Sequence, residues 1–216
     1  MATAEPGFFV SVEGVDGSGK STQAHRLAQA LAGQGLAVTV VRDPGTTPLG
    51  ERVRELLLEP QPGYRPEAWA EVALFLAARV QLLREVVEPA LAEGSVVVAD
   101  RYLDSTLVYQ GSGRGLDQER LLELHRLLGA DREPDLTLVL DLDVRAARRR
   151  IGGALPLDRM ELEPTAYHER VRRGYLELAE RFPRRVVVLD AGQPAGDLAR
   201  ACRRVVGERL QARTSR

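Results

Sequence analysis

A glycine-rich segment near the start of the chain, GVDGSGKST at 14–22, has the spacing of a phosphate-binding loop. It matches the pattern G-x-x-x-x-G-K-[S/T], in which glycines let successive backbone N–H groups surround a phosphate. The run FFVSVE precedes it and STQAHRLAQAL follows it, as a strand and a helix should. An ordinary glycine turn is the alternative. The functional interpretation assigns nucleotide phosphates to Gly14, Val15, Asp16, Gly17, Ser18, Gly19, Lys20, Ser21 and Thr22, and a Mg²⁺ contact to the Ser21 hydroxyl.

Lys20 is the only lysine in the chain, and the other 29 of the 30 basic residues are arginine. A codon preference for arginine explains the bias but not the exception. A lysine ammonium is a compact charge on a flexible stem, whereas arginine carries a wide planar fork. We therefore expect Lys20 to lie within the loop against the β- and γ-phosphates, where arginine would not fit.

The composition argues against several classes of protein. A length of 216 residues suits one domain, and a net charge of -1 gives no global attraction to nucleic acid or to an acidic membrane. The single Cys202 excludes an intramolecular disulfide and a multi-cysteine metal site. No segment has the pattern of a signal peptide or of a membrane span. We expect a cytoplasmic protein that binds neither nucleic acid nor membrane.

The order of the apolar segments predicts an α/β fold. Strands buried on both faces are expected from near-continuous apolar runs at 8–13, 37–42, 95–100, 136–141 and 185–190. Helices are expected at 20–34, 49–58, 67–93, 117–128, 144–150, 166–182 and 195–213. This alternation predicts a three-layer P-loop NTPase fold, a five-stranded parallel sheet flanked by helices. We expect one domain over 1–216, with a short mobile lid at approximately 148–162.

Acidic residues end several of the predicted strands, at Glu13, Asp100, Asp141 and Asp190. Open α/β sheets bind their ligands at this edge. Asp100 and Arg101 together could hold Mg²⁺ through water and a phosphate through a guanidinium fork, or could form a structural ion pair.

The predicted helix at 67–93 is apolar nearly all round, which requires cover on more than one side. It is either a central core helix or the seam of a homodimer. Within it, Phe75 and Arg79 are four positions apart and share one face. By spacing alone, a core phenylalanine beside a solvated arginine explains the pair.

The chain resembles bacterial thymidylate kinases over almost its whole length. The resemblance rests on segments in the family's order: VEGVDGSGKST at 12–22, RDPGTTPLGERVRELLL at 42–58, FLAARVQL at 75–82, DRYLDSTLVYQG at 100–111, PDLTLVLD at 134–141, and LDRMELE followed by YHERVRRGYLEL. It implies a P-loop kinase domain that transfers the γ-phosphoryl group of ATP to dTMP, with Mg²⁺ as cofactor, for dTTP biosynthesis. Because there is no second lysine, the Asn-Lys-x-Asp guanine-reading motif is absent, which disfavours a GTPase.

The resemblance also implies roles for individual residues. Phe75 would stack on thymine, Arg79 would donate to a base carbonyl, and Arg101 would bind the dTMP phosphate. Tyr109 would crowd the position of a 2′-hydroxyl. Asp16 would bind the 3′-hydroxyl and help to organise Mg²⁺, unless it only shapes the turn. The full dTMP site would comprise Asp16, Asp43, Arg54, Phe75, Arg79, Arg101, Ser105, Thr106, Tyr109 and Gln110, and the metal site Ser21 and Asp100.

Two features of the sequence differ from, or are not fixed by, the motifs common in this family. Asp43 stands where the family usually has Glu, and Thr46 where it has Gly, so Arg54 could share the role at the acceptor phosphate. The phosphate loop has no arginine between Gly14 and Lys20. In the bacterial class the lid supplies the charge on the migrating group, and Arg149 or Arg150 is our candidate beside the alternative of a solvated helix face. Catalysis would then combine Lys20, Arg101 and a lid arginine.

Two rival functions remain open at the level of sequence. A deoxynucleoside kinase would share the loop but would need a general base for a neutral hydroxyl, for which Glu13 is the candidate. An ATP-binding regulator without turnover is the second. The acceptor of a thymidylate kinase is a phosphate monoester, whose second pKa is about 6, so that enzyme needs no general base.

Overall fold

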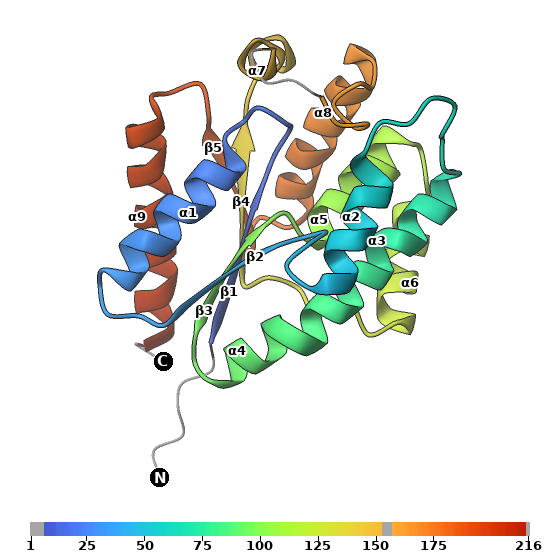
Figure 1. The fold of residues 1–216 in the computed structure, drawn as a ribbon. Coiled ribbons are helices and arrows are strands. Elements are labelled where there is room, and N and C mark those ends of the chain that lie inside the picture. The colour runs from blue at the N-terminus through green and yellow to red at the C-terminus, as the bar shows by residue number, and fades with distance from the viewer. Residues whose placement is uncertain (1–6, 153–156, 215–216) are drawn as a thin grey trace.

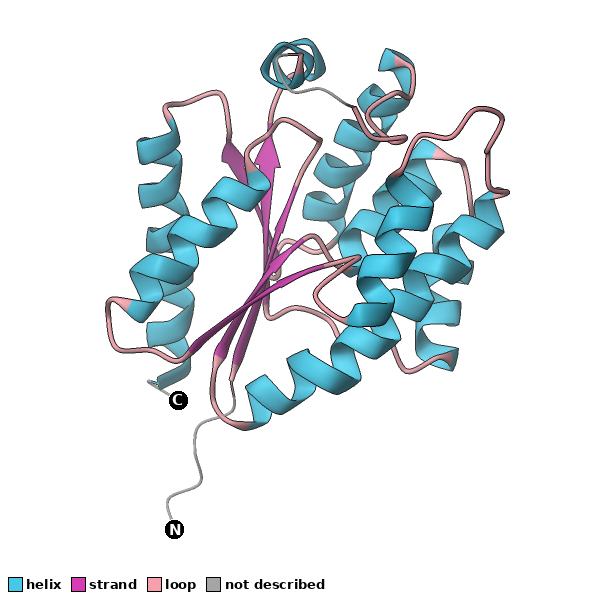
Figure 2. Ribbon diagram, in the orientation of Figure 1, coloured by secondary structure: helices cyan, strands magenta, loops and turns pink. Residues whose placement is uncertain are grey.

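The computed structural model describes residues 7–152 and 157–214, and its core is a parallel sheet (Figures 1 and 2). All pairings are parallel, and the strand order is β2-β3-β1-β4-β5. The P-loop strand therefore lies at the centre, which confirms the predicted α/β class. The strands are β1 (Phe8–Glu13), β2 (Val38–Arg42), β3 (Val96–Asp100), β4 (Leu136–Asp141) and β5 (Val186–Asp190).

The expectation that every strand is buried on both faces is right for three strands and wrong for two. β1, β3 and β4 are buried along almost their whole length. β2 and β5 are the edges of the sheet, so each has a strand neighbour on one side only, and Val40 and Val188 are 38% exposed. Apolar runs do not distinguish an edge strand from a central one, because β-branched residues suit both.

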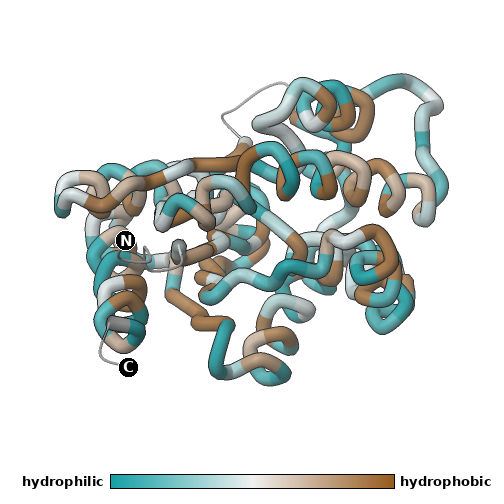
Figure 3. The backbone as a smooth tube through the Cα atoms, turned by 90° about the horizontal axis from the view of Figure 1, so that it is seen from below, coloured by the Kyte–Doolittle hydropathy of each residue, from teal (hydrophilic) through white to brown (hydrophobic). Residues whose placement is uncertain are grey.

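Helices cover both faces of the sheet, with α1 and α9 on one side and α2–α6 and α8 on the other (Figure 1). Hydrophilic and hydrophobic residues alternate along many of the helical turns, as seen from below in Figure 3. The helices are α1 (Lys20–Ala32), α2 (Pro48–Leu58), α3 (Ala68–Leu82), α4 (Glu88–Ala92), α5 (Leu103–Thr106), α6 (Gln118–Leu127), α7 (Val144–Ile151), α8 (Thr165–Arg181) and α9 (Ala195–Thr214).

Two helical rods contain π-helical turns. The segment predicted as one helix at 67–93 is α3, the π-helix η1 (Leu83–Val87) and α4 in direct succession. Likewise α5 continues into the π-helix η2 (Leu107–Gly113), which carries Tyr109 and Gln110. π-Helical turns are rare and frequently lie at functional sites.

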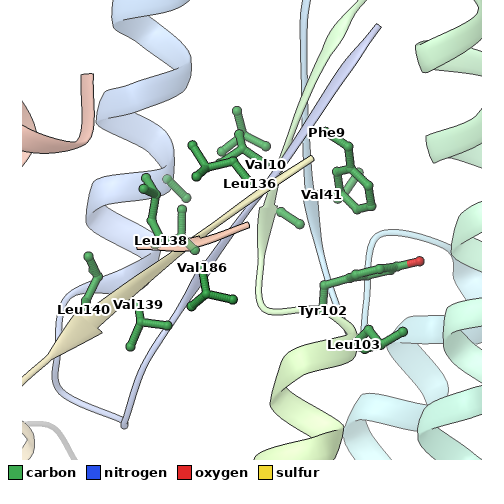
Figure 4. Close-up of a cluster of buried hydrophobic side chains, with 14 of the residues drawn as sticks. Phe9, Val10, Val41, Tyr102, Leu103, Leu136, Leu138, Val139, Leu140 and Val186 are labelled. Carbon is green, nitrogen blue, oxygen red and sulfur yellow. The ribbon is translucent and has the colours of Figure 1, made fainter. Parts of the chain in front are cut away.

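The hydrophobic core joins the sheet to both helical layers. In Figure 4, Phe9 of β1 and Tyr102 lie close together, and their ring centroids are 4.8 Å apart in an edge-to-face arrangement. The inward side of α3 also belongs to this core, through Val72, Leu76 and Leu82. This burial supports the core-helix explanation for the segment. None of the described helices has the length and apolar character needed to cross a membrane.

Candidate active site

The P-loop follows β1 directly and ends at the first turn of α1. Glycine is required where the loop approaches neighbouring backbone: a Cβ on Gly17 would lie 2.5 Å from the carbonyl oxygen of Ala147, and Gly17 has φ +81°. Lys20 is 7% exposed, and its Nζ donates to the carbonyl of Val15 at 2.9 Å and to Oδ1 of Asp16 at 3.3 Å. The ammonium group thus lies back inside its own loop.

The two proposed metal residues are already together. The Ser21 hydroxyl donates to Oδ2 of Asp100 at 2.5 Å, and this bond joins the first turn of α1 to the last residue of β3. A hydroxyl and a carboxylate are oxygen ligands of the kind that Mg²⁺ prefers, and Mg²⁺ is commonly held by one or two carboxylates plus substrate phosphates. No cluster of three or more His, Cys, Asp or Glu side chains suited to a metal occurs in 7–152 and 157–214. The donor set therefore fits a metal carried largely by the nucleotide.

Arg101 begins the loop after β3 in a left-handed conformation, with φ +67°. This is unusual for a residue with a side chain and costs about 1–3 kcal/mol. Its backbone N–H donates to the carbonyl of Val12 at 3.1 Å, so β1 fixes the turn. Its guanidinium lies 4.7 Å from the ring centre of Tyr109 and donates to the Ser105 hydroxyl at 3.1 Å. The side chain is thus aimed between the P-loop and η2.

Asp16 has the partners that a carboxylate beside phosphates needs. Its side chain forms ion pairs with Arg101 and Lys20 and accepts from the Tyr109 hydroxyl at 3.0 Å. Burial alone would raise the pKa of Asp16, but Arg101 and Lys20 outweigh it and hold that pKa well below the usual range. The carboxylate therefore connects the P-loop lysine to Arg101 after β3 and to Tyr109 of η2.

The ten residues predicted to bind dTMP line a single cavity. They come from the P-loop, the loop after β2, α2, α3, the loop after β3, α5 and η2, which meet at the carboxyl edge of the sheet. The cavity also has four lining residues that were not among the predicted site residues: Pro44, Leu58, Asp158 and Met160. Asp158 and Met160 lie in the LDRMELE segment, whose resemblance could have indicated them.

A groove along the P-loop adjoins this cavity. It is lined by Gly17, Gly19, Lys20, Ser21, Thr22 and Asp100 among others, whereas Gly14, Val15 and Ser18 are not part of its lining. Asp16, Arg54, Arg101 and Asp158 line both hollows. A donor phosphate in the groove and an acceptor in the cavity would therefore meet at these four side chains.

Arg79 is held by the protein on several sides. It is 1% exposed, with Nε donating to Oδ2 of Asp43 at 2.5 Å, and Nη1 donating to Thr106 Oγ1 at 2.9 Å and to Nε2 of His125 at 2.7 Å. Nδ1 of His125 lies 2.6 Å from the carbonyl of Leu121, so Nδ1 carries the proton and Nε2 accepts. Burial, then Arg79, lowers the pKa of His125 to about 4.

This arrangement excludes the solvated-arginine explanation, because Arg79 is buried and lines the cavity. It also shows what Asp43 contacts. One oxygen, Oδ2, pairs with Arg79, and Oδ1 accepts no hydrogen bond from the described part of the chain. Arg54 donates to the carbonyl of Pro44 at 3.2 Å beside it.

Glu13 is unsuited to act as a general base. It is fully buried and accepts from the backbone N–H of Tyr102 at 2.7 Å, the Ser105 hydroxyl at 2.6 Å and the Tyr175 hydroxyl at 2.9 Å. Burial, then Asp104, raises its pKa to about 7. Its oxygens are occupied in positioning the turn after β3, which removes the residue nominated for a deoxynucleoside kinase.

The segment predicted as the lid, approximately 148–162, is described only in part, since 153–156 lie outside the described residues. Arg150 lines the groove, and its Nη2 donates to the carbonyl of Ala191 at 3.0 Å. Arg149 is exposed on α7 and is not among the groove residues. Arg159 lies on the far side of the gap and binds Glu71 at 2.6 Å.

A parallel sheet with a P-loop beside its central strand, a strand-end carboxylate paired with the P-loop serine, and an adjoining acceptor cavity define a P-loop phosphotransferase. The family model described as thymidylate kinase matches residues 12–201. The chain belongs to the thymidylate kinase family.

Curated relatives and a solved structure agree. The chain is 44% identical over 207 residues to a thymidylate kinase of Pseudomonas savastanoi pv. phaseolicola, covering 96% of this chain and 98% of that one. It is 48% identical over 205 residues to a thymidylate kinase of Cereibacter sphaeroides, covering 91% and 93%. The crystal structure of thymidylate kinase from Ehrlichia chaffeensis is similar with a TM-score of 0.74 and 30% identity, covering 94% of this chain and 99% of that one.

Proposed function

We propose that this chain transfers the γ-phosphoryl group of ATP to dTMP, giving dTDP and ADP. The observation that carries the assignment is the meeting of the P-loop groove and the acceptor cavity at Asp16, Arg54, Arg101 and Asp158. A phosphoryl group bound by the loop would be in line with an acceptor in the cavity. Such positioning accounts for much of the catalysis of phosphoryl transfer.

Charge stabilisation follows from the same geometry. The acceptor oxygen of dTMP is already anionic at neutral pH, so the reaction needs no base, in keeping with the occupied oxygens of Glu13. Lys20 would turn from Asp16 to the donor phosphates, and Arg101 would bind the acceptor phosphate. Mg²⁺, bound through Ser21 and Asp100, would neutralise charge on the donor phosphates. Arg150, which lines the groove, is our candidate for the lid arginine.

Recognition of the nucleoside would come from the other walls of the cavity. Phe75 would stack on the base while Arg79 and Gln110 contact its edge, and all three line the cavity. The ring of Tyr109, held by Arg101 and Asp16, would close the space of a 2′-hydroxyl. Thr106 and Ser105 complete this wall.

We further propose a cytoplasmic homodimer that pairs through the rod formed by α3, η1 and α4. On α3, Ala70, Ala73 and Ala77 are exposed at helical spacing, which leaves a smooth apolar face on which a second helix can approach closely. The free, buried Cys202 is consistent with a reducing compartment. Mass measurement in solution would test the dimer, and a monomer at micromolar concentration would contradict it.

One assay tests the activity. ADP release with ATP and Mg²⁺ would be measured against dTMP, dUMP, dCMP, UMP and thymidine. We expect a clear preference for dTMP. Phosphorylation of thymidine but not dTMP would indicate a nucleoside kinase, and ATP binding without dTMP-dependent ADP release would indicate the regulator.

A further inference from the structure

Glu71 is a buried carboxylate on α3 that none of the assigned functions uses. It is fully buried, and each of its oxygens has strong partners. Oε1 accepts from Nε2 of Gln110 at 2.7 Å, and Oε2 accepts from Nη2 of Arg159 at 2.6 Å. Arg114 adds two longer contacts at 3.4 Å. Burying a carboxylate costs free energy, which only well-placed partners such as these can offset. This cost raises the question of what Glu71 does for the site.

We propose that Glu71 fixes the side-chain amide of Gln110 in one orientation and thereby makes the cavity selective for a pyrimidine that donates a hydrogen bond from N3. This inference rests on the proposed function, since it assumes that Gln110 meets the base. The amide oxygen and nitrogen have nearly the same shape, so only the hydrogen-bond partners decide which one faces the ligand.

The orientation follows from the chemistry of the partner. A carboxylate paired with guanidinium groups accepts hydrogen bonds and donates none, so Gln110 must present its NH₂ group to Glu71. The opposite end of the amide, Oε1, then remains on the side of the cavity that Gln110 lines. Among the side-chain hydrogen bonds within 7–152 and 157–214, the Gln110 amide makes only the one from Nε2 to Glu71, so Oε1 has no donor there. It is an acceptor available to a ligand.

An acceptor at this point discriminates between bases. Thymine and uracil carry N3–H, a donor, beside an acceptor carbonyl, whereas cytosine carries an N3 acceptor beside an amino donor. Gln110 Oε1 and the guanidinium of Arg79 line the same cavity and offer an acceptor and a donor. Cytosine would face both with the wrong polarity, and unpaired buried polar groups are expensive.

Arg159, in the segment predicted as the lid, holds Glu71 in place. Arg159 donates through its backbone N–H to the carbonyl of Leu58 at 2.9 Å and through Nε to that of Leu57 at 2.6 Å. Its guanidinium is therefore anchored to the end of α2 as it binds Oε2 of Glu71. Because Arg159 fixes Oε2 of Glu71, the other carboxylate oxygen, Oε1 of Glu71, faces Gln110. The carboxylate cannot rotate without losing its hydrogen bond to Arg159.

The test is the ratio of kcat/KM for dTMP to that for dCMP in Glu71→Gln and Glu71→Met. Both variants let the Gln110 amide turn, so this ratio should fall by roughly tenfold or more. The ratio for dTMP to dUMP should stay within twofold, because uracil has the same hydrogen-bonding edge. The matched control is Arg114→Gln, which removes another partner of Glu71 without touching Gln110. It should leave both ratios unchanged.

Two results would overturn the proposal: a dTMP-to-dCMP ratio unchanged in folded variants, or an equal fall in the dTMP-to-dUMP ratio. A measurement on the unmutated protein does not depend on variants that fold. The side-chain amide of Gln110, assigned in an NMR spectrum by its loss in Gln110→Glu, should show one slowly exchanging hydrogen with and without dTMP. Fast exchange in both states would refute the hydrogen bond to Glu71. A wild-type chain that ignores dTMP would instead refute the proposed function.

Discussion

The hydroxyl of Ser21 and the carboxylate of Asp100, 79 positions apart in sequence, are joined by a hydrogen bond of 2.5 Å. The bond connects the first turn of the P-loop helix to the carboxyl end of the neighbouring strand. The hydroxyl and the carboxylate are oxygen ligands of the kind that Mg²⁺ prefers, and together they would hold a Mg²⁺ that enters with ATP.

Asp100→Asn should therefore raise the Mg²⁺ concentration needed for half-maximal activity by about 10–100-fold, since the amide keeps the size of the carboxylate but not its charge. It should also lower kcat. The measurement is a Mg²⁺ titration of ADP release at saturating ATP and dTMP. Asp141→Asn is a matched control, because Asp141 ends the adjacent strand but pairs with Arg172. A wild-type Mg²⁺ dependence in Asp100→Asn would contradict the metal assignment.

Lys20→Arg should nearly abolish turnover and leave the fold intact. Nζ lies 2.9 Å from the Val15 carbonyl of its own loop and also contacts Asp16, a buried position that suits a compact ammonium group better than a wide guanidinium. We expect kcat to fall by on the order of 10²–10³ with an unfolding temperature close to that of the wild type. A variant that keeps most of its activity would show that the loop does not require the shape of lysine.

Glu13→Gln should change how stability depends on pH. Burial, then Asp104, raises the pKa of Glu13 from 4.5 to about 7, so the folded chain keeps a proton that the unfolded chain releases in that window. As the pH rises through this window, Glu13 lowers the wild-type free energy of unfolding by up to about 1.4 kcal/mol per pH unit. A glutamine does not titrate, so the variant lacks this loss.

The difference in unfolding free energy, Glu13→Gln minus wild type, should consequently rise between pH 4.5 and 7 and then level off. Urea denaturation at several pH values measures it. A difference that is flat across this range would mean that the carboxyl group of Glu13 is ionised in the folded protein.

His125→Leu should weaken dTMP binding without affecting ATP. Arg79 would lose the acceptor 2.7 Å away that helps to hold its guanidinium, so KM for dTMP should rise about tenfold. His125→Asn, which keeps an acceptor, should recover part of the loss. Because the pKa of His125 is lowered to about 4, the imidazole is neutral at pH 6–8, and this contribution should be independent of pH there. An equal rise in KM for ATP would point to general damage.

Arg150→Ala should lower kcat more than Arg149→Ala. Arg150 lines the donor groove and is tied to the loop after β5, whereas Arg149 is an exposed neighbour on the same helix. If Arg150 supplies charge to the migrating group, the loss is on the order of 10³. Single-turnover kinetics would separate this effect from product release. The reverse order of the two variants would assign the charge to Arg149.

Sequence alone predicted the parts of the fold and site that depend on local pattern. All five strands and the seven helical regions predicted from pattern follow from apolar runs, and the P-loop follows from its glycines and Lys20. The Phe75–Arg79 spacing continues one turn back to Glu71, so i, i+4, i+8 periodicity could have indicated Glu71 as a third member of that face.

The buried partners could not be predicted in the same way. His125 is 46 positions from Arg79, and Tyr175 is 162 positions from Glu13, so only the folded chain brings each pair together. Edge and central strands were also indistinguishable, because both are rich in valine. Local pattern specifies which face of an element is apolar, whereas the partner of a buried polar group depends on packing across the whole domain.

The π-helical turn η2 gives the site a dependence on chain length as well as on residue type. Each residue of an α-helix advances the side-chain direction by about 100°. Removing one residue from Leu107–Tyr109 would bring the segment closer to a regular α-helix, yet Gln110 would then point about a quarter-turn away from its present direction relative to Ser105 and Thr106. A deletion that improves the helix would therefore dismantle the acceptor cavity, which makes this segment intolerant of length changes even where single substitutions are accepted.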